Sequence, residues 1–142
     1  MHIITRRQEF LNMPKISVII PLLNKGPYIK RALDSVFAQN FKGFEVIVID
    51  GGSIDDGPDI VKKYGDNRRK FMRQGGKGVS AARNQAVNAC SSDLIAFLDA
   101  DDEWLPKHLG TIIELREKFP QAGAYTTAYK IKERNGNLRW AK

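Results

Sequence analysis

The chain has 142 residues, of which 42% are hydrophobic and 27% charged, and its formal net charge is +7. This length allows one domain with one core, and the single cysteine, Cys90, excludes a disulfide framework within the chain. A single cysteine fits a reducing cytosol, and we therefore expect a cytoplasmic protein. The longest apolar stretch, at residues 16–23, is far too short to span a bilayer.

The predicted elements alternate between strands and helices. Residues 1–13 contain two arginines but no apolar signal core, and we expect a flexible leader there. After it, hydrophobic periodicity predicts strand 16–21, helix 28–39, strand 45–50, helix 55–64, strand 70–73, helix 80–90, strand 94–98, helix 106–119 and strand 123–131, with a hairpin-turn signal at Asn135-Gly136.

The main strands are continuously apolar rather than alternating. This pattern is typical of an α/β fold with a mainly parallel sheet that helices cover on both faces. Ligands of such sheets bind outside the carboxyl ends of the strands. The loops 22–27, 51–56 and 99–103 leave those ends, so we expect them to gather at one edge.

A basic stretch at residues 62–77 contains seven lysines and arginines against Asp66 alone. Most of these side chains fit a solvated basic face. They would also attract a polyanion, such as a nucleotide diphosphate or an anionic membrane surface, which allows peripheral association with the inner face of a membrane. Nucleic acid is not an expected partner, because Tyr64 and Phe71 are the only aromatic residues of the stretch and no nucleic-acid-binding module matches.

A cluster of carboxylates follows the strand at 94–98. Asp99, Asp101 and Asp102 stand within four positions, and such groups repel one another unless a cation or solvent relieves them. Asp102 and Glu103 fit the start of the next helix in part. For Asp99 and Asp101 we favour metal or ribose binding, because Mg²⁺ and Mn²⁺ prefer carboxylate oxygens.

Two loops rich in glycine are weaker candidates. The turn 50–53 (Asp-Gly-Gly-Ser) would let a ligand approach the backbone, but it fits a tight strand-to-helix turn equally well. The loop 74–78 opens a helix, whose amino end attracts anions, and Lys77 and Arg83 add positive charge. It is not a Walker loop, and a flexible turn explains it equally well.

Four segments in this order resemble the motifs of family 2 glycosyltransferases, and the resemblance covers roughly residues 14–131. The segments are 16–24 (ISVIIPLLN), 45–53 (EVIVIDGGS), 78–84 (GVSAARN) and 95–106 (IAFLDADDEWLP). The resemblance implies a GT-A fold and the inverting transfer of a sugar from a nucleotide-diphosphate donor to a saccharide or lipid-linked acceptor, as in polysaccharide biosynthesis. The implied cofactor is Mg²⁺ or Mn²⁺.

The resemblance also implies roles for individual residues. The segment Asp99-Ala-Asp101 matches the DxD motif of the family, in which Asp101 would bind the metal and Asp99 would face the ribose and help to hold the metal. The other residues that we assign to nucleotide binding are Pro21, Leu22, Asn24, Asp50, Gly51, Gly78, Arg83 and Asn84.

The chain departs from the family pattern at Gly51, where the family commonly has an aspartate that often hydrogen-bonds uracil. The base of the donor is therefore left open. No residue matches the downstream catalytic base of the family, so we name no catalytic residue. We expect residues 14–142 to be the donor-binding part of a truncated domain that lacks its acceptor-binding part.

Two other functions compete with this interpretation. The first is a non-catalytic module that binds a nucleotide sugar. The second is a phosphoacceptor signalling domain that uses Asp50, but it would need an acidic pair after the first strand, and residues 21–24 supply none.

Overall fold

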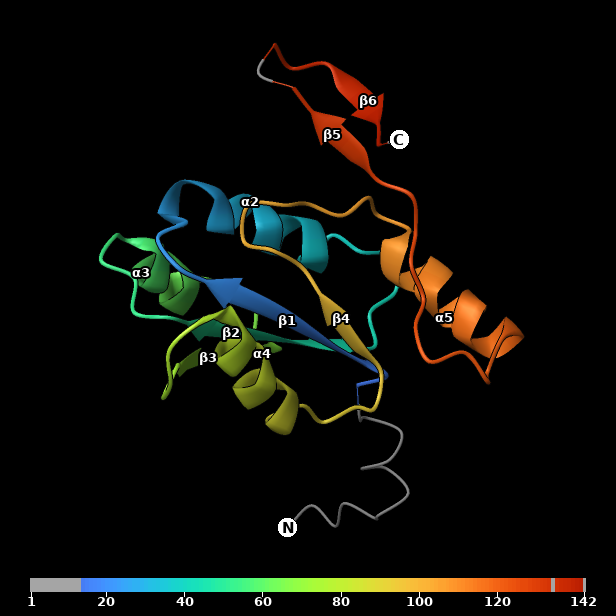
Figure 1. The fold of residues 1–142 in the computed structure, drawn as a ribbon, viewed down its shortest axis with the longest axis horizontal. Coiled ribbons are helices and arrows are strands. Elements are labelled where there is room, and N and C mark those ends of the chain that lie inside the picture. The colour runs from blue at the N-terminus through green and yellow to red at the C-terminus, as the bar shows by residue number, and fades with distance from the viewer. Residues whose placement is uncertain (1–13, 134, 142) are drawn as a thin grey trace.

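The centre of the protein is a four-stranded parallel sheet with the order β3-β2-β1-β4 (Figure 1). The computed structural model describes residues 14–133 and 135–141, so the predicted leader lies outside the described residues. The strands are β1 (Ile16–Leu22), β2 (Phe44–Asp50), β3 (Arg69–Arg73) and β4 (Ile95–Phe97). They alternate with the helices α2 (Gly26–Phe37), α3 (Gly57–Lys63), α4 (Val79–Asn88) and α5 (His108–Lys118). The predicted α/β sheet is confirmed.

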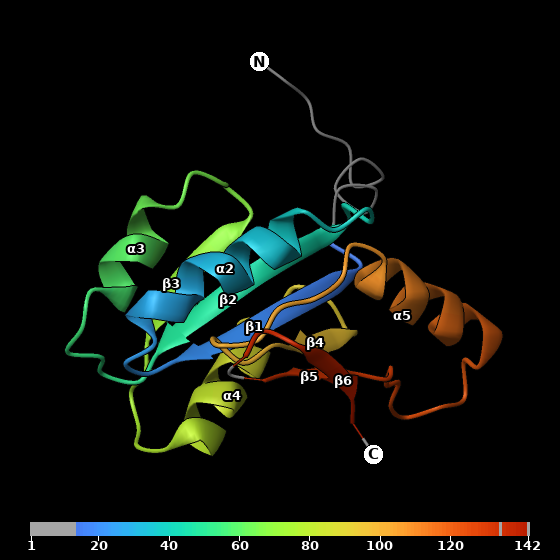
Figure 2. The ribbon, with the colours of Figure 1, turned by 90° about the horizontal axis from the view of Figure 1, so that it is seen from above.

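Helices cover both faces of the sheet, as predicted (Figure 2). Val18 and Ile20 of β1 belong to one buried cluster with residues of α2, α3 and α5. Ile19 points to the opposite face, where it clusters with Ile47 of β2 and Ala82 of α4. Because successive side chains of a strand point to opposite faces, a strand covered on both sides must be apolar at nearly every position. This explains the continuous apolar sequences of β1 and β2.

A proline ends the contact between β1 and β4. The amide of Leu98 donates to the carbonyl of Ile19 at 3.1 Å, so odd-numbered residues of β1 turn their backbone groups toward β4. Pro21 is the next odd-numbered residue; it has no N–H to donate and lies beyond the last β1–β4 pair, Ile19 with Phe97. The chain after β4 therefore diverges from β1 at Pro21, and a space opens there.

The structure differs from the sequence prediction at one strand. The predicted strand at 123–131 is wrong over 123–129, where the chain is irregular; the only ladder there is a hairpin of β5 (Lys130–Lys132) and β6 (Leu138–Trp140). β-branched and aromatic residues favour a strand only where a neighbouring strand pairs with it. The hairpin turn is confirmed, with a φ of 86° at Gly136. The strand predicted at 94–98 is confirmed as β4, which lies at an edge of the sheet and leaves Phe97 48% exposed.

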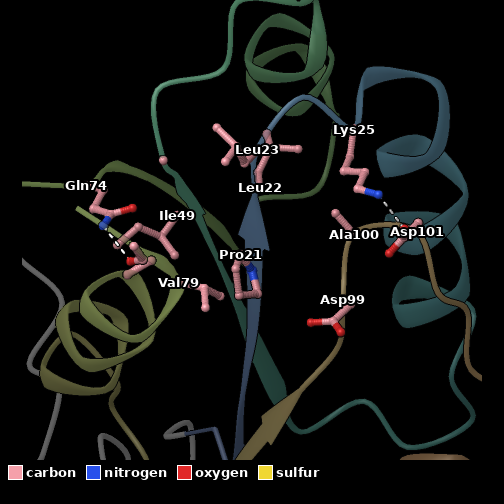
Figure 3. A pocket seen from close by; sticks show the side chains of 13 residues that line it. Pro21, Leu22, Leu23, Lys25, Ile49, Gln74, Val79, Asp99, Ala100 and Asp101 are labelled. Atoms are coloured by element: carbon pink, nitrogen blue, oxygen red, sulfur yellow. Dashed lines mark hydrogen bonds and ion pairs between the residues drawn. The ribbon is translucent and has the colours of Figure 1, made fainter. Parts of the chain in front are cut away.

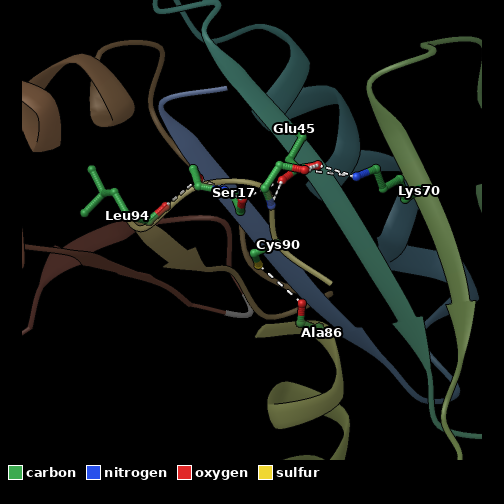
Figure 4. A network of polar contacts seen from close by, with 8 residues as sticks. Ser17, Glu45, Lys70, Ala86, Cys90 and Leu94 are labelled. Atoms are coloured by element: carbon green, nitrogen blue, oxygen red, sulfur yellow. Dashed lines mark hydrogen bonds and ion pairs between the residues drawn. The ribbon is translucent and has the colours of Figure 1, made fainter. Parts of the chain in front are cut away.

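A buried carboxylate joins three strands at the amino end of the sheet (Figure 4). Glu45 of β2 is 6% exposed. Its Oε1 accepts hydrogen bonds from Ser17 Oγ and from the backbone N–H of Ser91, both at 2.6 Å, and its Oε2 accepts one from Lys70 Nζ at 2.7 Å. Burial alone would raise the pKa of Glu45, but these hydrogen bonds outweigh it and hold the pKa below its usual value.

We predict that Glu45→Gln lowers the free energy of unfolding by about 1 to 3 kcal/mol at pH 7, because an amide cannot accept all of these hydrogen bonds. The folded-state pKa of Glu45 is lowered. The ionised carboxylate therefore adds to the free energy of unfolding above the unfolded-state pKa of about 4.3, and this contribution is lost as the pH falls through the folded-state pKa. The difference between variant and parent should therefore shrink below about pH 4. Urea unfolding at several pH values measures it.

The matched control is Glu114→Gln, at an exposed position of α5, which should change stability by less than about 0.5 kcal/mol. Equal stability of Glu45→Gln and the parent at pH 7 would contradict the role assigned to the carboxylate.

Candidate functional site

A pocket of about 270 Å³ lies at the carboxyl edge of the sheet (Figure 3). After β1 the strand order continues to one side with β2 and β3, while β4 lies on the other side, so this is the point where the order reverses. The pocket is lined by Pro21, Leu22, Leu23, Lys25, Ile49, Gly51, Gln74, Gly78, Val79, Ala82, Asp99, Ala100 and Asp101. The loops predicted to gather at one edge supply most of these residues.

One end of the pocket is acidic. Asp99 and Asp101 follow β4 and flank the buried Ala100, which anchors the turn between them. Each carboxylate contacts a cation from another element: Lys25 Nζ lies 2.6 Å from Asp101 Oδ2, and Arg83 Nη2 of α4 lies 2.9 Å from Asp99 Oδ1. The structure therefore pairs both aspartates with positive charge.

These contacts control the ionisation of the acidic end. The hydrogen bond from Lys25 holds the pKa of Asp101 below its usual value, and the same bond raises the pKa of Lys25. The pKa of Asp102 is raised, first by burial and then by the neighbouring charges of Asp101 and Asp99. Asp101 is thus the carboxylate that these contacts hold in its charged form, as a cation ligand requires.

The opposite end of the pocket is uncharged and contains Gly51, Gln74 and Gly78. The backbone N–H of Gln74 donates to the carbonyl of Asp50 at 2.8 Å, and its Nε2 donates to the carbonyl of Gly78 at 2.8 Å. A Cβ built on Gly51 would lie 3.1 Å from Gln74 Oε1. Gln74 therefore fills the space that a side chain at position 51 would enter.

Two predicted site residues hold the loops beside the pocket. Asn24 has a φ of 51°, a conformation that asparagine tolerates better than most residues. Its Oδ1 accepts from the N–H of Ile54 and its own N–H donates to Ser53 Oγ, both at 2.9 Å. Asp50 is 1% exposed; its Oδ1 accepts from the N–H of Ser53 at 3.0 Å, and its Oδ2 has no partner among the described residues.

The remaining predicted residues fall into three groups. Those that line the pocket are Pro21, Leu22, Gly51, Gly78, Asp99 and Asp101. Arg83 does not line it but contacts it through Asp99, and Asn84 is exposed on α4 outside the lining. Sequence reasoning missed Lys25 and Gln74. Both belong to loops that it singled out, but neither residue type signals a ligand on its own.

The acidic end fits a divalent cation that shares its ligands with a substrate. The described residues contain no group of three or more histidine, cysteine, aspartate or glutamate side chains that could hold a metal. Mg²⁺ is typically held by one or two carboxylates together with phosphate oxygens, so Asp99 and Asp101 suffice if a phosphate completes the coordination. Lys25 must then give up its contact with Asp101 Oδ2 or share that carboxylate.

The chain is similar to known proteins in sequence and in fold. The sequence model of the family described as Glycosyl transferase family 2 matches residues 17–142. The GalNAc(5)-diNAcBac-PP-undecaprenol beta-1,3-glucosyltransferase of Campylobacter jejuni is 34% identical over 130 residues, which cover 89% of this chain and 41% of that protein. The chain spans between 18% and 41% of the length of eight curated relatives that it matches.

Two solved structures resemble the fold. The structure of S. aureus TarS in complex with UDP-GlcNAc has a TM-score of 0.66 and 32% identity, and the match covers 75% of this chain and 32% of that chain. The mannosyltransferase PcManGT from Pyrobaculum calidifontis, in complex with GDP-Man and Mn²⁺, has a TM-score of 0.67 and 25% identity, over 73% of this chain and 32% of that chain.

The loop that carries Lys25 depends on Gly26, which is buried against the start of α3. The N–H of Gly26 donates to Asp55 Oδ2 at 2.7 Å, and a Cβ built on Gly26 would overlap the carboxylate of Asp56. We predict that Gly26→Ala lowers the free energy of unfolding by about 1 to 3 kcal/mol, because the Asp56 side chain must turn away and the start of α3, whose Gly57 N would lie 3.2 Å from the new Cβ, must shift slightly. Thermal and urea unfolding measure the change.

Gly110 of α5 is the matched control, since a Cβ built there has no neighbour within 4 Å. Gly110→Ala should leave stability unchanged or raise it by up to about 1 kcal/mol, because alanine is the better helix former. If both changes had the same effect, close packing at Gly26 would not explain the loop.

Proposed function

Since the chain belongs to glycosyltransferase family 2, we propose that its pocket binds the nucleotide diphosphate of a sugar donor together with Mg²⁺ or Mn²⁺. The observation that carries this proposal is the position of Asp99 and Asp101 at one end of a pocket where the strand order reverses. The complexes of the two similar structures, with UDP-GlcNAc and with GDP-Man and Mn²⁺, support it.

The proposed ligand relieves an electrostatic conflict. A diphosphate and two aspartates all carry negative charge, so they can share one end of the pocket only if a cation lies between them. Asp101 would hold that cation, with Asp99 as a second ligand or as the partner of the ribose. When bound, the cation would neutralise the charge that develops on the departing nucleotide diphosphate.

The other residues of the site would position the donor. The ammonium of Lys25, released from Asp101 by the cation, would stay near enough to pair with a phosphate. Arg83 would hold Asp99 in place through the bond that the two already share. Pro21 and Val79 supply apolar walls that exclude water from the bound nucleotide.

We further propose that the sugar is transferred with inversion to a saccharide or lipid-linked acceptor, in polysaccharide biosynthesis. Such a transfer needs a general base within hydrogen-bond reach of the acceptor hydroxyl. Asp99 and Asp101 would both be engaged on the leaving-group side, so neither is assigned that role. The role that we assign to the described residues is therefore to bind the donor.

A lipid-linked acceptor would be reached at a membrane surface. No helix among the described residues is long and apolar enough to cross a membrane. Lys62, Lys63 and Lys77 are exposed and would attract an anionic surface. We expect the chain to cosediment with phosphatidylglycerol vesicles at low salt. Equal binding to anionic and neutral vesicles would contradict peripheral association.

We predict that Asp101→Asn weakens binding of UDP or GDP in the presence of Mn²⁺ by about 10- to 100-fold, the loss found even for residues that only support a metal ligand. The amide keeps the shape of the carboxylate but removes its charge. The fold should remain intact, because the side chain of Asp101 is 42% exposed. Isothermal titration calorimetry with Mn²⁺ and with EDTA measures the effect.

In EDTA the variant and the parent should bind equally weakly. Asp93→Asn is the matched control, because Asp93 is exposed, precedes β4 and does not line the pocket. Equal affinity of Asp101→Asn and the parent in Mn²⁺ would sink the metal assignment.

A further inference from the structure

We propose that Gln74 recognises the base of the bound nucleotide through its side-chain oxygen, and selects bases that carry an imino N–H over those that do not. Uracil and guanine carry such a group; cytosine and adenine do not. This inference rests on the proposed function, because it concerns the base of the same ligand.

The polarity of the pocket places the base near Gln74. Lys25, Asp99 and Asp101 supply the charged groups at one end, and Gln74 lies at the other end, beyond Pro21 (Figure 3). A nucleoside diphosphate has its charge at one end and its base at the other. With the diphosphate and its cation at the aspartates, the base extends toward the uncharged end. Gln74 is the one uncharged polar side chain among the described residues of the lining.

A hydrogen bond fixes the orientation of the amide. Nε2 of Gln74 donates to the carbonyl of Gly78 at 2.8 Å. A carbonyl only accepts hydrogen bonds, so the NH₂ group must face Gly78 and Oε1 must point the other way. No described residue donates to Oε1 within hydrogen-bond distance. The oxygen is therefore a free acceptor that belongs to an anchored side chain.

The glycine at position 51 makes room for this acceptor. A Cβ on Gly51 would lie 3.1 Å from Gln74 Oε1, while its other neighbours, Leu22 O and Leu23 Cδ1, would be at ordinary contact distances of 3.5 and 3.7 Å. At position 51 the turn after β2 thus contributes no side chain to the pocket, and Oε1 of Gln74, in the loop after β3, lies beside that position. The loss of an acceptor at position 51 is compensated in space by Gln74.

The chemistry of the bases then sets the selectivity. N3–H of uracil and N1–H of guanine can donate to Oε1, whereas N3 of cytosine and N1 of adenine would place a lone pair against it. The acceptor is neutral, and neutral hydrogen bonds are about half as strong as those to a carboxylate. The expected discrimination is about three- to tenfold.

UDP and CDP provide the sharpest test, because they share ring size, ribose and diphosphate. In Mn²⁺, the parent chain should bind UDP about three- to tenfold more tightly than CDP by calorimetry. Gln74→Ala should bring this ratio close to one. Gln74→Met, which keeps the bulk of the side chain without its polar atoms, should do the same and covers the case in which the alanine variant folds poorly.

Gln85→Ala is the matched control. Gln85 supports the same loop, since its Oε1 accepts from the N–H of Gly75 at 2.8 Å and its Nε2 donates to the carbonyl of Arg73 at 3.0 Å, but it does not line the pocket. Disturbing the loop should weaken the binding of UDP and of CDP equally and leave the ratio of the two affinities unchanged. A fall of the ratio in Gln85→Ala as large as in Gln74→Ala would overturn the inference.

A rescue variant adds a second test. Gly51 does not adopt a left-handed conformation, so its backbone can accept an aspartate. In the Gln74→Ala background, Gly51→Asp should restore a ratio of UDP to CDP affinity at least as large as that of the parent, since a carboxylate is the stronger acceptor. If the parent binds both nucleotides but does not prefer UDP, or if Gln74→Ala keeps the preference, the inference fails while the proposed function stands. If the parent binds no nucleoside diphosphate with Mn²⁺, the proposed function itself fails.

Discussion

The site depends on unequal pairing along β1. Its parallel pairing with β2 continues to the last residue, where Leu22 lies opposite Asp50, but its pairing with β4 stops earlier, at Ile19 with Phe97. The loops after β1 and β2 therefore begin side by side at the carboxyl edge of the sheet, while the chain after β4 leaves β1 earlier. Backbone hydrogen bonds therefore define where the pocket opens.

Burial distinguishes the two groups of charged residues at opposite ends of the sheet. Glu45 is nearly inaccessible, and its two oxygens accept hydrogen bonds from Ser17, Lys70 and Ser91, so replacing the carboxylate disturbs several donors at once. Asp101 is 42% exposed and is paired with one flexible lysine that is 40% exposed. An exposed pair of this kind contributes little to stability and can exchange its cation at low cost. The first group is therefore structural, and the second is suited to a ligand.

The sequence predicted the sheet and the positions of the loops well, because both follow from local patterns. The apolar runs of β1 and β2 reflect burial on two faces, and Asp99 and Asp101 follow β4 directly. The prediction failed where structure depends on a partner strand, because segment 123–129 has strand-forming residues but no strand to pair with it. Pairing partners are not encoded in local composition.

The uncharged end of the pocket shows the same limit at the scale of one side chain. From the sequence alone, Gly51 is a residue without a side chain that could accept a hydrogen bond, and Gln74 is a polar residue in a glycine-rich loop. In space the two positions meet, because β2 pairs with β3 up to Asp50 and Arg73, and the residues that follow each strand emerge side by side. A missing side chain at one strand end must therefore be judged with the side chain that faces it from the next strand. Whether this end of the pocket offers a hydrogen-bond acceptor depends on positions 51 and 74 together, and neither residue predicts it alone.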